Sequence, residues 1–330
     1  MRFDVFGMCN PLFDIQAEIS DDVLAGLGFE KGTMRLIDEG EQKRLVATIY
    51  ENIVNAESGG SGANTMIGLA QLGGSGCFTG KLGNDEHGVL YAQSLTSRNV
   101  HLPAIVGNGT TGICVVLITP DAERTLCTFL GISRELGPDD LDRDSIASSK
   151  YIYITGYLWD TESQQAAVVR AMEIAKEHGV KVALSLSDPF CVGRHKEAFL
   201  SLTEQYVDLL IGNHEEMQAL TGCSTPEAAI LATSSIADMA AVTVGAKGSI
   251  IRSGNSLCAI GGFQVDPVDT TGAGDMYAAG LLYGLTHDLS IEHTGKLAGY
   301  VASRVVASLG PRLSSLDDDY VTGLLTRKPS

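Results

Sequence analysis

The sequence has 330 residues, a formal net charge of −17, 44% hydrophobic residues and seven cysteines. This acidic balance argues against nucleic acid or an anionic membrane surface as a partner, because both attract basic patches, and no apolar run is long enough for a membrane span or a signal peptide. The cysteines form no C-x-x-C pair, so we expect reduced thiols in a cytoplasmic protein, without a disulfide framework or a zinc site.

Short β-rich runs among glycines and polar residues dominate the first third of the chain. We predict strands at Phe13–Ile19, Thr33–Ile37 and Thr111–Thr119, none of which is coupled to a long helix. These runs predict a small β-sheet lid, formed by residues of approximately 11–40 and 100–130 and inserted in a single domain that spans residues 1–330.

Strands and helices alternate in the second half of the chain. The predicted strands are Tyr151–Thr155, Val180–Leu186, Asp208–Gly212 and Ala240–Val244. The predicted helices are Ala63–Leu72, Ser163–His178, a segment that begins at Asn213, and Ala273–Leu285. This alternation predicts the α/β class, with a doubly wound, mostly parallel sheet flanked by helices. The tail, Thr326–Ser330, is expected to be disordered.

The segment TTGAGD, residues Thr270–Asp275, opens directly into an apolar helical pattern. The first N–H groups of a helix lack intrahelical partners and carry partial positive charge, and small residues leave them accessible to a phosphate. A carboxylate at this place repels an anion, so Asp275 is better explained as a general base that takes a proton from an attacking hydroxyl. The alternative is a tight glycine turn followed by an acid that matches the helix dipole.

A second glycine-rich helix start lies within SGGSGANTMIGLAQLGG, residues Ser58–Gly74. Asn64 falls in its first turn, and an amide can both donate to and accept from neighbouring hydroxyls. The alternative is that Asn64 is only a helix-start residue. Two glycine-rich helix starts in one chain predict two halves of a ligand site that face each other.

Four segments resemble the motifs of the PfkB (ribokinase-like) kinases, which include ribokinase, fructokinase and adenosine kinase. They are GGSGANTMIGLAQLGGSGCFTGKLGNDEHG at 59–88, GNHEEMQALTG at 212–222, TVGAKGS at 243–249 and DTTGAGD at 269–275. The resemblance covers nearly the whole chain. It implies a ribokinase-like fold and an ATP-dependent kinase that transfers the γ-phosphoryl group to a primary hydroxyl of a nucleoside or a sugar.

The resemblance also implies roles for residues on the acceptor side. Asp275 would be the catalytic base. The anion hole for the transferring phosphoryl group would be formed by the N–H groups of Gly272, Ala273 and Gly274. The hydroxyls of the acceptor would be held by Asp14, Gly60 and Asn64.

On the donor side, the resemblance implies a nucleotide loop, a metal site and a cation loop. The residues along the nucleotide would be Thr243, Gly245, Lys247 and Gly248. Arg124, on the lid, would reach the phosphates, and Asn213 with Glu216 would help to order Mg²⁺ and its waters. Asp269 begins a loop that binds a monovalent cation such as K⁺ in several relatives. Asn213 and Glu216 can instead be a helix cap and its capping-box partner.

The acceptor motif GGSGAN differs from the GGKGAN of ribokinases and from the GGSxQN type of adenosine kinases. The segments NPLFDIQAEI at 10–19, SLSDPFCV at 185–192 and, loosely, PRLSS at 311–315 are similar to the adenosine kinase branch. We therefore expect a nucleoside or sugar kinase of that branch, a monomer or a homodimer. Phe13, Met34 and Cys127 are candidates for the apolar side of the acceptor pocket, or for the lid core.

Three alternatives remain at this stage. A ribokinase- or fructokinase-type sugar kinase shares all four motifs. A catalytically silent regulatory protein would bind a sugar or nucleotide only, and the presence of Asp275 argues against it. An NAD-dependent oxidoreductase needs a G-x-G-x-x-G that opens a helix, but the match at Gly107–Gly112 is followed by a predicted strand.

Overall fold

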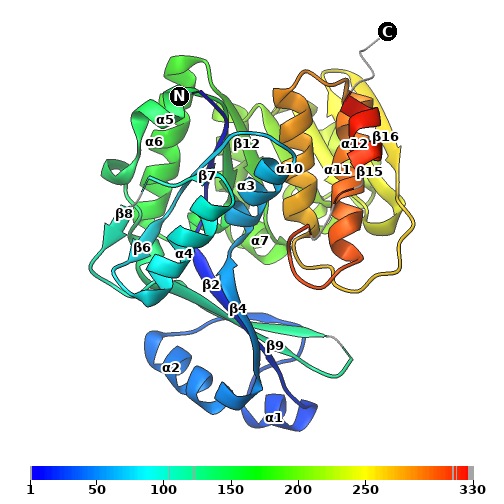
Figure 1. Ribbon diagram of the computed structural model, residues 1–330. Coiled ribbons are helices and arrows are strands. Elements are labelled where there is room, and N and C mark those ends of the chain that lie inside the picture. Colours follow the sequence, from blue (N-terminus) through cyan, green and yellow to red (C-terminus); the bar gives the residue numbers. More distant parts are fainter. Residues whose placement is uncertain (1, 104, 122, 314–315, 317, 326–330) are drawn as a thin grey trace.

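A nine-stranded sheet forms the centre of the molecule (Figure 1). The structure is a computed structural model that describes residues 2–103, 105–121, 123–313, 316 and 318–325. In spatial order the strands are β16 (Ser256–Gly261), β15 (Gly248–Ser253), β14 (Met239–Thr243), β13 (Leu209–Asn213), β12 (Lys181–Ser185), β11 (Ser149–Thr155), β1 (Phe3–Met8), β5 (Gly76–Thr79) and β7 (Val100–His101). The strands from β14 to β7 pair in parallel, whereas β15 and β16 are antiparallel.

Helices cover both faces of this sheet, as the alternating pattern predicted. One face packs against α3 (Ser61–Gln71), α4 (Glu86–Ser97), α10 (Ala273–Thr286), α11 (Ile291–Val306) and α12 (Asp318–Leu325). The other packs against α5 (Arg143–Ala147), α6 (Glu162–His178), α7 (Pro189–Tyr206), α8 (His214–Thr221) and α9 (Pro226–Ala232). Coverage on both faces explains why the central strands are buried along nearly their whole length.

The bounds of α6 follow from local chemistry. The Thr161 side chain accepts from the Gln164 N–H at the N-cap, and Gly179 ends the helix in the left-handed region at φ 68°. Ser and Thr satisfy unpaired N–H groups at helix starts, and glycine adopts a left-handed C-cap without strain. The tail at Thr326–Ser330, expected to be disordered, lies outside the described residues. Among the described helices, none is both long and apolar enough to cross a bilayer.

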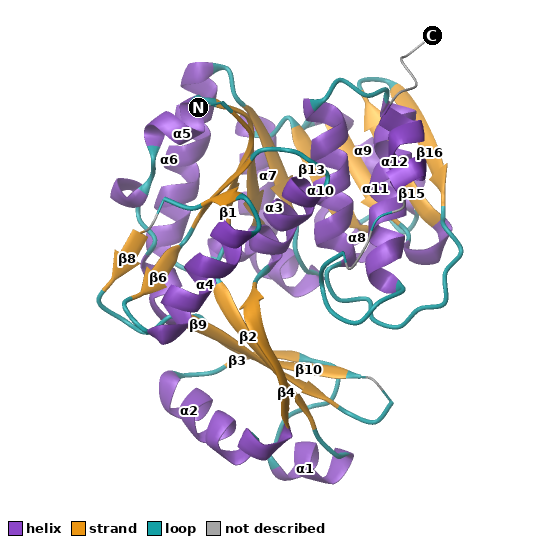
Figure 2. Ribbon diagram, viewed as in Figure 1, coloured by secondary structure: helices purple, strands orange, loops and turns teal. Residues whose placement is uncertain are grey.

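A separate five-stranded sheet forms the lid and lies apart from the main sheet (Figure 2). Its strands, in spatial order, are β3 (Met34–Leu36), β10 (Arg124–Phe129), β9 (Gly112–Ile118), β2 (Leu12–Glu18) and β4 (Ile53–Gly59). It reaches further than the predicted segments 11–40 and 100–130, because β4 belongs to it. Strands β7 and β8 (Ile105–Gly107) lie outside the lid sheet, since β7 joins the main sheet and β8 pairs with β6 (Lys81–Gly83).

The lid strands were expected to be coupled to no long helix, but two short helices cover one face of the lid sheet. Helices α1 (Asp21–Gly26) and α2 (Glu39–Thr48) place Leu24 and Leu45 in one cluster with Phe13 and Cys127. Phe13 and Cys127 therefore belong to the lid core and do not line the acceptor side. The segment Gly107–Gly112 connects β8 to β9 and opens no helix, so it is not a dinucleotide fingerprint.

Candidate active site

The carboxylate of Asp275 is held by two side chains of the acceptor motif. Its Oδ1 accepts from Ser61 Oγ at 2.5 Å, and its Oδ2 accepts from Asn64 Nδ2 at 3.0 Å. Burial raises the pKa of Asp275, while these two hydrogen bonds and the charge of Arg312 lower it. Asp275 lies in the first turn of α10 and both partners lie on α3. The two glycine-rich helix starts therefore meet at the predicted base.

The start of α10 has the conformation that the sequence requires. Gly272 is the N-cap at φ 76°, and a Cβ there would lie 2.5 Å from the carbonyl oxygen of Pro311. Only glycine adopts this conformation easily, and its missing side chain leaves room for Pro311. The Ala273 N–H donates to the Thr270 carbonyl at 3.2 Å, so one of the three predicted anion-hole donors is already bonded. Gly274 belongs to the first helical turn, whose N–H groups lack intrahelical partners.

Asp14 lies opposite this helix start, on β2. Its carboxylate contacts Gly59, where any Cβ would collide with it. Gly60 is the N-cap of α3 at φ 87°, and a Cβ there would lie 2.6 Å from the Asn10 carbonyl oxygen. Burial raises the pKa of Asp14 to about 7; the charge of Arg312 opposes that effect and the charge of Glu57 adds to it. An acceptor that donates hydroxyl protons to Asp14 would stabilise its ionised form.

A cavity of about 400 Å³ joins two segments that are far apart in the sequence. Thr243, Gly245 and Gly248 line one side. Thr270, Ala273 and Gly274, from the start of α10, line the other. Lys247 is exposed and is not among the lining residues. The predicted nucleotide loop and two of the three predicted anion-hole residues thus share one cavity, whose walls are mostly glycine, alanine and other apolar residues.

Asn213 and Glu216 form a reciprocal capping box at the start of α8. The Asn213 side chain accepts from the Glu216 N–H at 2.9 Å, and the Glu216 carboxylate accepts from the Asn213 N–H at 2.9 Å and from Asn213 Nδ2 at 2.8 Å. Burial raises the pKa of Glu216 to about 7, and the charge of Asp188 contributes. Among the described residues, no group of three or more metal-ligating side chains gathers.

Arg124 reaches from lid strand β10 to the loop before α10. It donates to Thr271 Oγ1 at 2.7 Å and to the carboxylate of Asp269 at 2.5 Å. The Asp269 carboxylate also accepts from the Thr271 N–H at 2.9 Å and the Gly310 N–H at 2.8 Å. The predicted cation loop is therefore bonded to a guanidinium, which ties the lid to the anion-hole segment.

The inner face of the lid sheet carries Asp14 together with exposed apolar side chains. Strand register places Leu36 on the face of Asp14, through Thr128 and Cys114. Met34 lies two residues before Leu36 and therefore shares that face. Met34 and Leu36 are 41% and 48% exposed. This face combines the carboxylate of Asp14 with an apolar surface.

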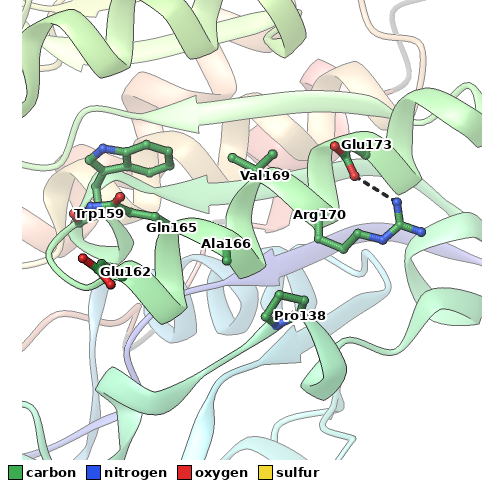
Figure 3. A pocket seen from close by; sticks show the side chains of 8 residues that line it. All are labelled: Pro138, Trp159, Glu162, Gln165, Ala166, Val169, Arg170 and Glu173. Atoms are coloured by element: carbon green, nitrogen blue, oxygen red, sulfur yellow. Dashed lines mark hydrogen bonds and ion pairs between the residues drawn. The ribbon is translucent and has the colours of Figure 1, made fainter.

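A second cavity, of about 540 Å³, lies elsewhere (Figure 3). It follows the outer side of α6, between Trp159, Pro138 and the ion pair of Arg170 with Glu173. Trp159 packs against Phe199, with ring centroids 6.3 Å apart. None of the predicted site residues lines this cavity, so it is not the candidate active site.

Comparison with known proteins assigns the family. The family model described as pfkB family carbohydrate kinase matches residues 34–318. The chain belongs to this pfkB family. This confirms the predicted family and, with it, the predicted activity: an ATP-dependent phosphotransferase that acts on an alcohol group of a sugar or nucleoside.

Relatives of this pfkB kinase carry both acceptor types in their names. It is 27% identical to an adenosine kinase of Saccharomyces cerevisiae over 93% of this chain and 95% of the relative. It is 30% identical to a probable fructokinase-4 of Arabidopsis thaliana over 71% of this chain and 74% of the relative. The names leave the acceptor open between a nucleoside and a sugar.

Solved structures of the family confirm the predicted α/β fold with its mostly parallel sheet. A probable sugar kinase from Rhizobium etli superposes with a TM-score of 0.91 and 33% identity, covering 98% of this chain and 99% of that one. An adenosine kinase from Sinorhizobium meliloti superposes with a TM-score of 0.87 and 36% identity, covering 96% and 97%.

Two residues without a role predicted from the sequence contact the predicted site residues. Ser61, which bonds Asp275, lies inside the quoted acceptor motif and was noted only as part of the departure from the ribokinase pattern. Arg312 donates to Asn64 Oδ1 at 3.3 Å and to Glu57 at 2.9 Å. It lies in the quoted PRLSS segment, which was given no chemical role.

Proposed function

We propose that the chain transfers the γ-phosphoryl group of ATP to the primary hydroxyl of a nucleoside. One observation carries the reaction: Asp275 is bonded to the acceptor helix by Asn64, while Ala273 and Gly274, just before it, line the donor cavity. A base between a donor cavity and an acceptor motif is the arrangement that in-line phosphoryl transfer needs.

The lid face favours a nucleoside over a bare sugar. Met34 and Leu36 offer exposed apolar surface on the face of Asp14. A free sugar is covered with hydroxyls and gains little from such a surface, whereas a nucleobase gains by covering it. The 36% identity to a protein named adenosine kinase supports this choice, and the fructokinase relatives keep a sugar as the alternative acceptor.

Each side chain then has a role that its position supports. Asp14 and Asn64 hold neighbouring hydroxyls of the acceptor ring, backed by Gly60. Asp275 takes the proton of the attacking hydroxyl, and the backbone at Gly272 and Gly274 stabilises charge on the transferring group. The lid excludes water from this reaction, which suppresses hydrolysis of ATP.

A divalent ion fits the donor side without a protein cage. Mg²⁺ keeps most of its water shell in such sites and is bound largely through phosphates, so the buried carboxylate of Glu216 and the amide of Asn213 are sufficient to order its waters. When bound, the ion neutralises phosphate charge. Arg124 supplies a further positive charge for the phosphates if it leaves Asp269, and a K⁺ ion near Asp269 would take over the charge balance there. The enzyme would act in the cytoplasm as a monomer or homodimer.

The test is phosphoryl transfer from ATP to adenosine, 2′-deoxyadenosine, ribose and fructose, with wild type and Asp14→Ala. We expect adenosine to be the best acceptor, and loss of a ring hydroxyl to lower kcat/KM strongly, because a site built to bond a hydroxyl leaves buried polar groups unpaired without it. Asp14→Ala should flatten the preference. Fructose or ribose as the best acceptor would replace the nucleoside by a sugar, and equal rates on adenosine and its deoxy form would remove the role of Asp14 and Asn64.

A further inference from the structure

A short segment after α11 connects the two halves of the site. The Gly310 N–H donates to Asp269 at 2.8 Å, and Pro311 fills the space left by the missing side chain of Gly272. The Leu313 carbonyl accepts from Gln71 Nε2 at 3.0 Å, at the end of α3. We call residues 310–313 the strap, because they touch both the anion-hole loop and the acceptor helix.

Arg312 is the charged residue of the strap, and its side chain is only 9% exposed. Its guanidinium donates to Glu57 Oε2 at 2.9 Å, to Asn64 Oδ1 at 3.3 Å, and to the carbonyl and hydroxyl oxygens of Ser58. Glu57 and Ser58 belong to β4, which leads into the acceptor helix. Four acceptors around one buried guanidinium hold it in a single orientation.

The orientation of the Asn64 amide follows from its two neighbours. A guanidinium has only donors, so the face of Asn64 toward Arg312 must present Oδ1. A carboxylate has only acceptors, so the face toward Asp275 must present Nδ2, which donates at 3.0 Å. With a cation on one side and an anion on the other, the amide cannot flip without losing both hydrogen bonds.

Arg312 also balances the charge of two partly buried acids of the site, Asp14 and Asp275. Its charge lowers the pKa of Asp275 and is the largest effect that opposes burial in the pKa of Asp14. Arg124 acts on Asp14 more weakly, and its guanidinium is bonded to Asp269. Glu57, which is hydrogen-bonded to Arg312, has the opposite effect, because its negative charge raises the pKa of Asp14.

We propose that Arg312 is a positioning residue of the active site: it fixes the amide of Asn64, through it the carboxylate of Asp275, and supplies the positive charge that Asp14 and Asp275 share. This inference rests on the proposed function for its consequence in catalysis. Its structural content, the link from Arg312 through Asn64 to Asp275, stands on the contacts alone.

The test uses Arg312→Gln, with Arg304→Gln as the matched control, because Arg304 is an exposed arginine on α11. The carboxyl groups of Asp14 and Asp275 are titrated by ¹³C NMR, assigned with Asp→Asn variants, and kcat and KM for adenosine are measured across pH. We expect both carboxyl groups to titrate at higher pH in Arg312→Gln. The acid limb of kcat should move in the same direction, with a loss of about tenfold near neutral pH, less than the 10²–10⁴-fold that a missing base costs.

Two further variants separate positioning from folding. Arg312→Lys keeps the positive charge but lacks the planar guanidinium. The pKa values of Asp14 and Asp275 should therefore stay close to those of wild type, while kcat should still fall. Arg312→Ala should regain activity in millimolar guanidinium chloride and not in sodium chloride. If Arg312→Gln does not fold, Arg312→Lys and Arg312→Ala decide whether Arg312 positions Asn64. Titration curves that match wild type, or a loss of thermal stability without any change in the pH profile, would reduce Arg312 to a structural residue. If wild type phosphorylates no acceptor, the proposed function fails, while the NMR titration still decides the role of Arg312.

Discussion

Asn64 donates its Nδ2–H to Asp275 Oδ2 at 3.0 Å, although the two residues lie 211 positions apart in the sequence. The contact joins α3, which carries the acceptor motif, to α10, whose first residues line the cavity of about 400 Å³. The hydrogen bond therefore places Asp275 at the junction of the two helix starts.

Replacement of this carboxylate tests its chemistry. Asp275→Asn keeps the size of the side chain and removes the proton acceptor, so we expect kcat to fall by about 10²–10⁴-fold while ATP and the acceptor still bind. Steady-state rates and calorimetry measure the two effects, with Asp266→Asn, an exposed acid before the same motif, as the control. If Asp275→Asn keeps more than half of kcat, Asp275 is only a helix-start acid.

Asp14 should destabilise the acceptor-free protein at neutral pH. Its folded-state pKa is about 7, against about 3.9 in an unfolded chain. Between these values the folded state binds more protons than the unfolded state, so the free energy of unfolding falls as pH rises through this window. Asp14→Asn removes this effect. We expect its Tm to exceed that of wild type at pH 8 and to equal it near pH 4, and a lower Tm at pH 8 would contradict the buried charge.

Glu216→Gln separates the metal role from the capping role. Glutamine at this position still completes a capping box, so α8 and the thermal stability should be retained. The charge is lost, and we expect activity to need a higher Mg²⁺ concentration. A Mg²⁺ titration of both proteins at fixed ATP decides the question. Superimposed curves would leave Asn213 and Glu216 with a structural role alone.

The bond between Arg124 and Asp269 should hold the lid near the anion-hole loop. Arg124→Gln weakens it, and we expect faster amide hydrogen exchange in β9 and β10 of the acceptor-free protein. Arg35→Gln breaks an exposed lid ion pair with Glu41 and serves as the control. Acceptor should then slow exchange in these strands in wild type. Identical exchange in wild type and Arg124→Gln would show that the ion pair does not restrain the lid.

The main sheet could be predicted from the sequence because it rests on local signals, and the two helix starts of the candidate site are marked in the same way. Residues that begin and end helices, such as Thr161 and Gly179 at the ends of α6, mark the alternation of strands and helices in the sequence. The glycines at 60 and 272 have positive φ and marked both helix starts that meet at Asp275. These features depend on a few neighbouring residues, so the sequence alone indicates them.

The lid was harder to predict from the sequence, because its helices and strands have weak hydrophobic patterns. Helix α2 has the sequence EGEQKRLVAT and buries only Gln42 and Leu45, so its apolar stripe is too narrow to reveal a helix. Strand β4 is mostly exposed toward its start and gives no clean alternation. The role of Arg312 could not be predicted from the sequence for another reason. Its partners lie near residue 60, and a contact between residues 248 positions apart leaves no local sequence pattern.

That separation constrains the order in which the protein becomes competent during synthesis. Asn64 leaves the ribosome long before Arg312 is made, so the contact between them forms only after nearly all of the chain has been synthesised. A nascent chain that has already built much of its sheet would still lack the cation that Asp14 and Asp275 share. Translation would therefore yield a kinase of reduced activity until Arg312 packs against β4 and α3.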